Sequence, residues 1–74
     1  MGMLIANFGN LSLAELQGIV ARGEQRAADK YDVSVIYHEF SKCASVTGRA
    51  QDVMFIIGDV AAEGWDCLRS VSRV

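Results

Sequence analysis

Residues 51–74 read QDVMFIIGDVAAEGWDCLRSVSRV, and this stretch decides the fold. Before its second glycine, apolar residues recur at spacings of three and one: Val53, Ile56, Ile57, Val60 and Ala61. Such spacing places them on one face of an α-helix. Gly64 follows where a helix commonly ends in a left-handed residue, and the stretch after it is rich in Val, Leu and Cys. The pattern predicts a helix over residues 49–63 and a strand over residues 65–73.

The first part of the chain predicts a strand followed by a helix. Residues 3–8 have the composition and length of a strand, and Gly9-Asn10 ends it. Ser12 and Glu15 have the spacing of a capping box, in which each side chain satisfies a free N–H group of the first helical turn. We therefore expect a helix over residues 12–29.

Residues 31–40 give the clearest strand signal. Their side chains alternate between two faces that both carry apolar groups: Val33, Val35 and Tyr37 on one, Ile36 and Phe40 on the other. This predicts a central strand covered on both sides. Residues 41–48 are either a polar loop or a short strand. The fold expected for the single domain 1–74 is α+β, with a small antiparallel or mixed sheet of about three strands packed against two helices.

Residues 53–57 leave a second interpretation open. If they form a buried strand, residues 60–74 become a helix, and the order of elements becomes that of a double-stranded-RNA-binding domain. Such a domain bridges phosphates with basic groups at the start of its last helix. Asp59 and Glu63 occupy that position here, so we expect no nucleic-acid partner.

Composition sets further bounds. The chain has 74 residues, a net charge of −2 and no apolar run near the roughly 20 residues of a membrane span. Residues 3–8 lack the basic start of a signal peptide. Cys43 and Cys67 are too far apart for a zinc motif and suit free thiols in a reducing cytoplasm. A domain this small buries only about 60% of its unfolded surface, which favours self-association.

The segment AAEGWDCLRSV, residues 61–71, resembles the signature of a family of small uncharacterised bacterial and phage domains, in which a helix ends in Ala-Glu-Gly-Trp before a strand. The segment KYDVSV, residues 30–35, is similar to the family's opening strand, so the resemblance spans residues 30–71. It implies helix then strand, with Trp65 buried against the helix, and it implies no activity. The chain lacks the family's C-terminal partner strand, which residues 3–8 are expected to replace.

A Cys–His pair is the one catalytic candidate in the sequence. His38 and Cys43 lie close enough along the chain to form a thiolate nucleophile. No third residue is identifiable that would orient the histidine, and one histidine with two separated cysteines matches no metal-ligand spacing. We therefore expect no catalytic residue, no metal, no cofactor and no enzymatic activity.

Met54 and Phe55 are the residues that suggest a partner. They lie off the apolar stripe of the second helix, so that helix needs cover on more than one side. Either the first helix covers them, or they form an interface, where Met and Phe are favoured. We expect a homodimer or higher oligomer that also binds another protein. One form of such a module is a phage or mobile-element inhibitor of a host defence protein.

A small-ligand binder is the alternative function. Tyr31, Tyr37 and Trp65 are able to stack on a base, and Arg49 to hold a phosphate, in a protein that binds or sequesters a nucleotide at a subunit seam.

Overall fold

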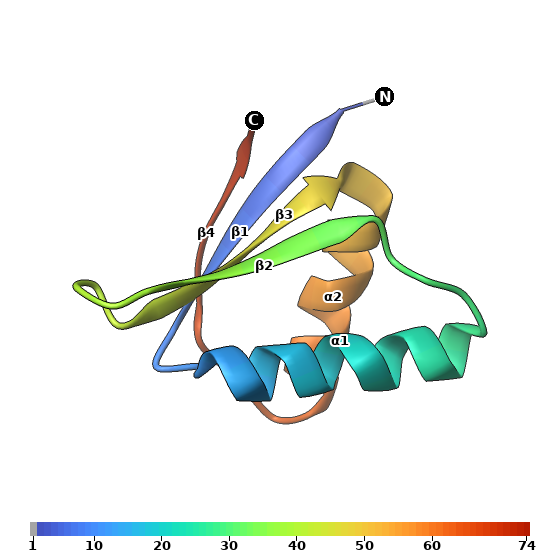
Figure 1. Ribbon diagram of the computed structural model, residues 1–74, viewed down its shortest axis with the longest axis horizontal. Coiled ribbons are helices and arrows are strands. Elements are labelled where there is room, and N and C mark those ends of the chain that lie inside the picture. The colour runs from blue at the N-terminus through green and yellow to red at the C-terminus, as the bar shows by residue number, and fades with distance from the viewer. Residues whose placement is uncertain (1) are drawn as a thin grey trace.

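The computed structural model describes residues 2–74, which form a four-stranded antiparallel sheet with two helices on one face (Figure 1). The elements in chain order are β1 (Met3–Gly9), α1 (Leu13–Ala27), β2 (Val33–His38), β3 (Cys43–Arg49), α2 (Ala50–Ala62) and β4 (Leu68–Arg73). The strand order β2-β3-β1-β4 interlocks two βαβ units, which is the ferredoxin-like arrangement. This fold hosts many unrelated functions, so it does not by itself indicate one. The expected α+β class is confirmed.

The expectation of about three strands is wrong because β3 is a full strand in the middle of the sheet. Residues 41–48 looked too polar for that place. Ala44 and Val46 are fully buried beneath the helices, as their apolar character requires. Ser45 points to the other face and is also fully buried. Ala44 and Val46 thus alternate with Ser45 as a strand requires, and the short-strand alternative for residues 41–48 is the one the structure has.

The expectation that β2 is a central strand is also wrong. It pairs only with β3 and forms one edge of the sheet. Its second apolar face does not signal cover on both sides, because Ile36 is half exposed and Phe40 is fully exposed. The true central strands are β1 and β3. β1 also pairs with β4, so residues 3–8 do supply a partner for the last strand.

Both helices begin and end largely where local signals indicate. The Ser12 hydroxyl accepts a hydrogen bond from the Glu15 N–H (3.1 Å), and the Ser12 N–H donates to the Glu15 carboxylate (3.3 Å), which confirms the capping box. Gly64 has φ +91°. The Gly64 N–H donates to the Ala61 carbonyl (3.0 Å) and the Trp65 N–H to the Val60 carbonyl (3.2 Å). This Schellman motif ends α2.

A continuous helix α2 rules out the double-stranded-RNA-binding interpretation of residues 53–57. Neither helix of the described chain is long and apolar enough to cross a membrane.

The core lies between the sheet and the helices. Its fully buried members come from the central strands and from one face of each helix: Ala6, Phe8, Ala44, Val46, Leu16, Ile19, Val53, Ile56 and Val60. β4 has no such cover, and every one of its residues is exposed. Trp65, which leads into β4, packs against the border of the core and has intermediate exposure.

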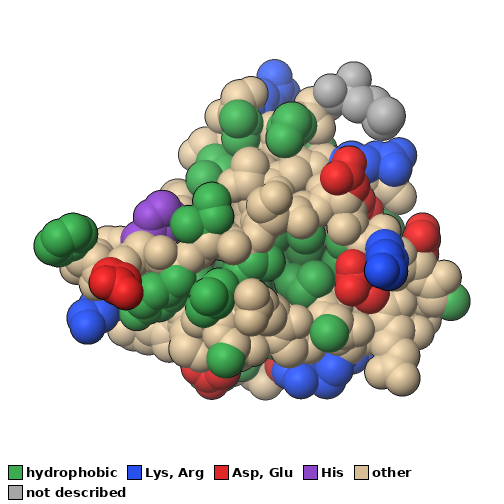
Figure 2. All heavy atoms as spheres, viewed as in Figure 1, with side chains coloured by type: hydrophobic (Ala, Val, Ile, Leu, Met, Phe, Trp, Pro, Cys, Tyr) green, Lys and Arg blue, Asp and Glu red, His purple; other side chains and the backbone are tan. Residues whose placement is uncertain are grey.

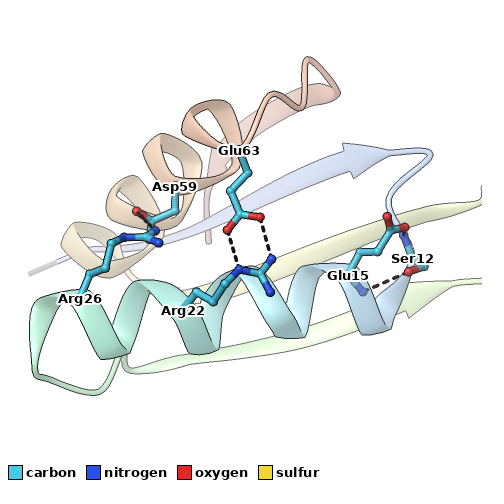
Figure 3. A network of polar contacts seen from close by, with 6 residues as sticks. All are labelled: Ser12, Glu15, Arg22, Arg26, Asp59 and Glu63. Carbon is cyan, nitrogen blue, oxygen red and sulfur yellow. Dashed lines mark hydrogen bonds and ion pairs between the residues drawn. The ribbon is translucent and has the colours of Figure 1, made fainter.

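Two ion pairs join the helices side by side (Figure 3). The Arg22 guanidinium donates to both Glu63 carboxylate oxygens, at 2.9 and 2.6 Å, and Arg26 pairs with Asp59 at 3.2 Å. The bond from Arg22 lowers the pKa of Glu63 below its ordinary value. Arg22 and Arg26 face α2, and the opposite side of α1 carries Glu24, whose carboxylate accepts a hydrogen bond from the Tyr31 N–H (2.8 Å).

Candidate functional site

A row of hydrogen-bonded side chains crosses the open face of the sheet, the face away from the helices. His38 Nε2 lies 2.8 Å from Ser45 Oγ, the Ser45 hydroxyl donates to Asn7 Oδ1, and Asn7 Nδ2 donates to Ser70 Oγ at 2.8 Å. These residues lie on β2, β3, β1 and β4 in turn. The row joins all four strands and supplies hydrogen-bond partners to the buried hydroxyl of Ser45.

Ser45, at the centre of the row, is fully buried. Its hydroxyl donates to Asn7 Oδ1, and the donor in the contact with His38 Nε2 depends on the histidine tautomer. The row links the side chains of all four strands across this face.

The Cys43–His38 pair is not assembled. The two residues lie directly opposite each other on β3 and β2, yet Cys43 Sγ contacts Ser41 Oγ, at 3.1 Å. Both cysteines are free thiols; Cys43 is buried, and burial raises the pKa of Cys67. In the part of the chain from residue 2 onward, no group of three or more His, Cys, Asp and Glu side chains is placed to hold a metal ion.

The open face also offers no platform for bases. Sheets that bind single-stranded RNA stack bases on aromatic side chains of this surface. On the central strands β1 and β3, the positions of this face are occupied by Ile5, Asn7, Ser45 and Thr47. None of these side chains is aromatic.

The four residues proposed for a nucleotide lie at different places. Tyr31 and Arg49 are neighbours, since the Arg49 N–H donates to the carbonyl of Asp32 (3.0 Å). Tyr37 lies at the far end of β2, and Trp65 lies near the start of β4. These two strands are the opposite edges of the sheet, three strand spacings or about 14 Å apart.

The cavity beside Arg49 does not join these four residues. Its volume is about 190 Å³, below the range of typical ligand pockets. Its lining residues are Gly2, Met3, Asp32, Gly48 and Arg49. Tyr31, Tyr37 and Trp65 do not line it.

Met54 and Phe55 are both about half exposed, at 56% and 50%, and lie on different sides of α2. The Phe55 ring stacks on Tyr31 with centroids 6.2 Å apart. Burial, together with the nearby Asp59 carboxylate, raises the pKa of Tyr31, whose hydroxyl donates to Asp59 at 3.2 Å. Met54 lies about 100° further round the helix, on the side away from α1. That both belong to one interface stays a prediction.

The outer side of β2 is the feature that sequence reasoning missed. The Asp32 carbonyl bonds to Arg49 on β3, so by alternation the backbone groups of Val33, Val35 and Tyr37 point away from the sheet. We call the outer side of β2, with the backbone and side chains of these three residues, the β2 edge. β2 has no charged residue and no proline. Natural sheets usually protect such edges with charges, prolines or bulges.

The opposite edge of the sheet, β4, is protected. It carries Arg69 and Arg73, and its register with β1 shifts between Asn7 and Phe8. Charges and a bulge are the devices that discourage strand addition. The two edges of the same sheet therefore differ in the property that decides whether another strand can pair.

An apolar strip accompanies the β2 edge. The side chains of Val33, Val35 and Tyr37 point toward the helices but are only partly buried. Figure 2 shows hydrophobic side chains gathered between β2 and α1 in the middle of the view, with charged groups around them. Gln17 and Ala21 lie on the adjoining side of α1, away from Arg22 and Arg26. The sequence signal was the uncharged alternation of residues 33–38.

No protein-family model matches this chain, and no curated protein or solved structure is significantly similar to it. The resemblance of residues 30–71 to small bacterial and phage domains stays a prediction. The function therefore has to be argued from the geometry of the described residues.

Proposed function

We propose that this domain is a non-enzymatic interaction module that self-associates through the β2 edge. The observation that carries the proposal is an unprotected edge strand lying beside an apolar strip, on a sheet whose other edge is charged. An edge strand of this kind is a template for adding another strand. The polar row on the open face supports a role without catalysis, because its groups are directed at one another.

Backbone hydrogen bonds and apolar burial both contribute to pairing at the β2 edge. Backbone groups at the β2 edge exchange bonds with water for bonds with a second strand, so each bond contributes only about 0.5–1.5 kcal/mol net. Covering the half-buried side chains of Val33, Val35 and Tyr37 adds about 25 cal/mol for each Å² of apolar surface removed from water. Hydrogen bonds and apolar burial both favour the pairing, and the hydrogen bonds also set the register.

Self-association should appear as a change of mass with concentration. The chain of 8.0 kDa should approach twice this mass in light scattering as its concentration rises from about 10 to about 500 μM, since dimerisation follows mass action. Val35→Pro should keep the protein monomeric, because it removes an N–H that points away from β3 and places a ring on the β2 edge.

Val71→Pro is the matched control on the other edge. The Val74 N–H donates to the Met3 carbonyl, so by alternation the Val71 N–H also points away from its neighbour β1. This variant should dimerise like the native chain. Circular dichroism should show that both variants are folded. A native chain that keeps the monomer mass over the whole range would contradict the proposal.

A further inference from the structure

We propose that the second copy pairs with β2 antiparallel about a two-fold axis at Val35, and that Phe40 at the β2–β3 hairpin tip packs against the partner's Tyr31 and Phe55. This inference rests on the proposed self-association and names its geometry. A two-fold contact uses the same surface of both copies, so the strand has to be complementary to itself. β2 meets that condition, because it has no charge that would face its own copy.

The outward backbone groups select the register. With Val35 opposite the partner's Val35, Val33 lies opposite the partner's Tyr37, and every outward N–H and C=O group of the three residues gains a reciprocal bond. A shift by one residue would turn the helices of the two copies to opposite faces. A shift by two residues would leave Val33 or Tyr37 without a partner inside the strand. The Val35-centred register is therefore the one that uses the whole edge.

The same register closes the apolar strip. Residues directly opposite each other in an antiparallel pair point to the same face, so Val33 would contact the partner's Tyr37 beneath the helices. Val35 would meet its own copy there. The neighbouring sides of the two α1 helices present Gln17 and Ala21, together with Glu24, whose carboxylate is bonded to the Tyr31 N–H of its own copy. The β2 edge and the strip beside it are covered in one contact.

The hairpin tip gives an independent reason for this arrangement. Phe40 is fully exposed, and the hairpin extends beyond the body of the domain (Figure 1). In the Val35-centred register, the segment after β2 reaches the segment before the partner's β2. Phe40 then lies opposite the partner's Lys30, next to the partner's Tyr31, whose ring stacks on the half-exposed ring of Phe55. Aromatic groups of this kind are frequent anchors of interfaces.

Charges at the two ends of the strand contribute to this pairing. The tip carries Glu39 and Lys42, and the segment before β2 carries Asp29, Lys30 and Asp32. In the Val35-centred register, Lys42 lies next to the partner's Asp29, whereas Glu39 lies between the partner's Lys30 and Asp32. The Lys42–Asp29 pair forms once at each end of the contact, which favours a second copy over an unrelated strand.

Cysteine cross-linking in the full chain tests the register. In a Cys43→Ala, Cys67→Ala background, Ser34→Cys and Ile36→Cys place thiols on the exposed face of β2. In the Val35-centred register, position 34 of one copy faces position 36 of the other, at a Cα separation of about 4.5 Å. That separation lies within the range of disulfides. Mild oxidation should cross-link a mixture of the two variants, one copy carrying a mass tag, and neither variant alone.

Each other outcome has a defined meaning. Cross-linking of Ile36→Cys alone or of Ser34→Cys alone would place the axis one residue away and overturn the register. A dimer by light scattering without any of these cross-links would overturn this inference while the proposed self-association stands. A monomer throughout would leave the β2 edge to a strand of another protein and overturn both.

Replacing Phe40 tests the aromatic contact separately. Phe40→Ser should raise the dissociation constant of the dimer at least tenfold. Each copy contributes one Phe40 contact, so the substitution removes two such contacts from the dimer. Met54→Ser is the matched control: it removes a side chain of similar exposure from the side of α2 away from α1, and dimerisation should be unchanged. Equal dissociation constants for Phe40→Ser and the native chain would overturn the contact with the partner's Tyr31 and Phe55.

Discussion

Replacing Phe8 with alanine is expected to lower the free energy of unfolding by about 3–5 kcal/mol, the largest loss that we expect from a single substitution. Phe8 is fully buried on the central strand β1, beneath the helices. Truncating such a side chain costs about 3–5 kcal/mol. A domain of 74 residues has a total stability of about 4–11 kcal/mol, at 0.05–0.15 kcal/mol per residue. The loss is therefore about half of the free energy of unfolding at the middle of both ranges.

Urea denaturation followed by circular dichroism measures this loss. Phe40→Ala is the control, because the Phe40 side chain is fully exposed at the hairpin tip. Measured at low concentration, where monomer dominates, it should change the free energy of unfolding by less than about 0.5 kcal/mol. A Phe8→Ala variant within about 1 kcal/mol of the native chain would contradict the position of the core.

Replacing Gly48 with alanine is expected to destabilise the fold by about 2–3 kcal/mol, near the top of the range for overpacked sites. A Cβ atom on Gly48 would overlap the carbonyl oxygen of Asp32 and lie too close to Val33. These are largely backbone atoms, so β2 itself would have to move away from β3. The bond from the Arg49 N–H to the Asp32 carbonyl would be strained by the same movement.

Gly58→Ala is the control for this change. Gly58 lies within α2, and a Cβ there would meet open space. Because alanine favours a helix over glycine by about 1 kcal/mol, this variant should be as stable as the native chain or more stable. Thermal melts of the two variants should therefore shift in opposite directions. A Gly48→Ala variant with an unchanged melting temperature would contradict the close approach of β2 and β3.

Signals contained within a few residues allowed much of the fold to be predicted. The capping box at Ser12 and Glu15 and the glycine stop at Gly64 depend on neighbouring backbone groups, so the sequence indicates both helices directly. The alternation in β2 likewise identified a strand, and the strand composition of residues 3–8 identified β1.

The order of the strands could not be predicted in the same way. β3 is central although it carries several polar residues. Its buried Ser45 can lie there because His38 and Asn7, from other strands, supply its hydrogen-bond partners. β2 is an edge although it is apolar on both faces. Such features depend on pairings between distant segments, which no local pattern contains.

The candidate site depends on that order and was missed for the same reason. The β2 edge becomes visible only once β2 is known to pair on one side. Tyr31, Tyr37 and Trp65 were grouped as a ligand site because all three are aromatic, but the sheet places Tyr37 and Trp65 far from each other. The Tyr31–Phe55 stack, by contrast, joins two residues predicted for different roles.

Amide hydrogen exchange measured by NMR at two concentrations tests the central claim most directly, that the β2 edge is the surface of self-association. At about 20 μM, the outward amides of Val33, Val35 and Tyr37 should exchange rapidly, while those of Ser34 and Ile36, bonded to β3, stay protected. At about 1 mM, where mass action favours the dimer, all five should be protected. Outward amides that exchange equally fast at both concentrations, in a protein shown to be dimeric at the higher one, would contradict the account.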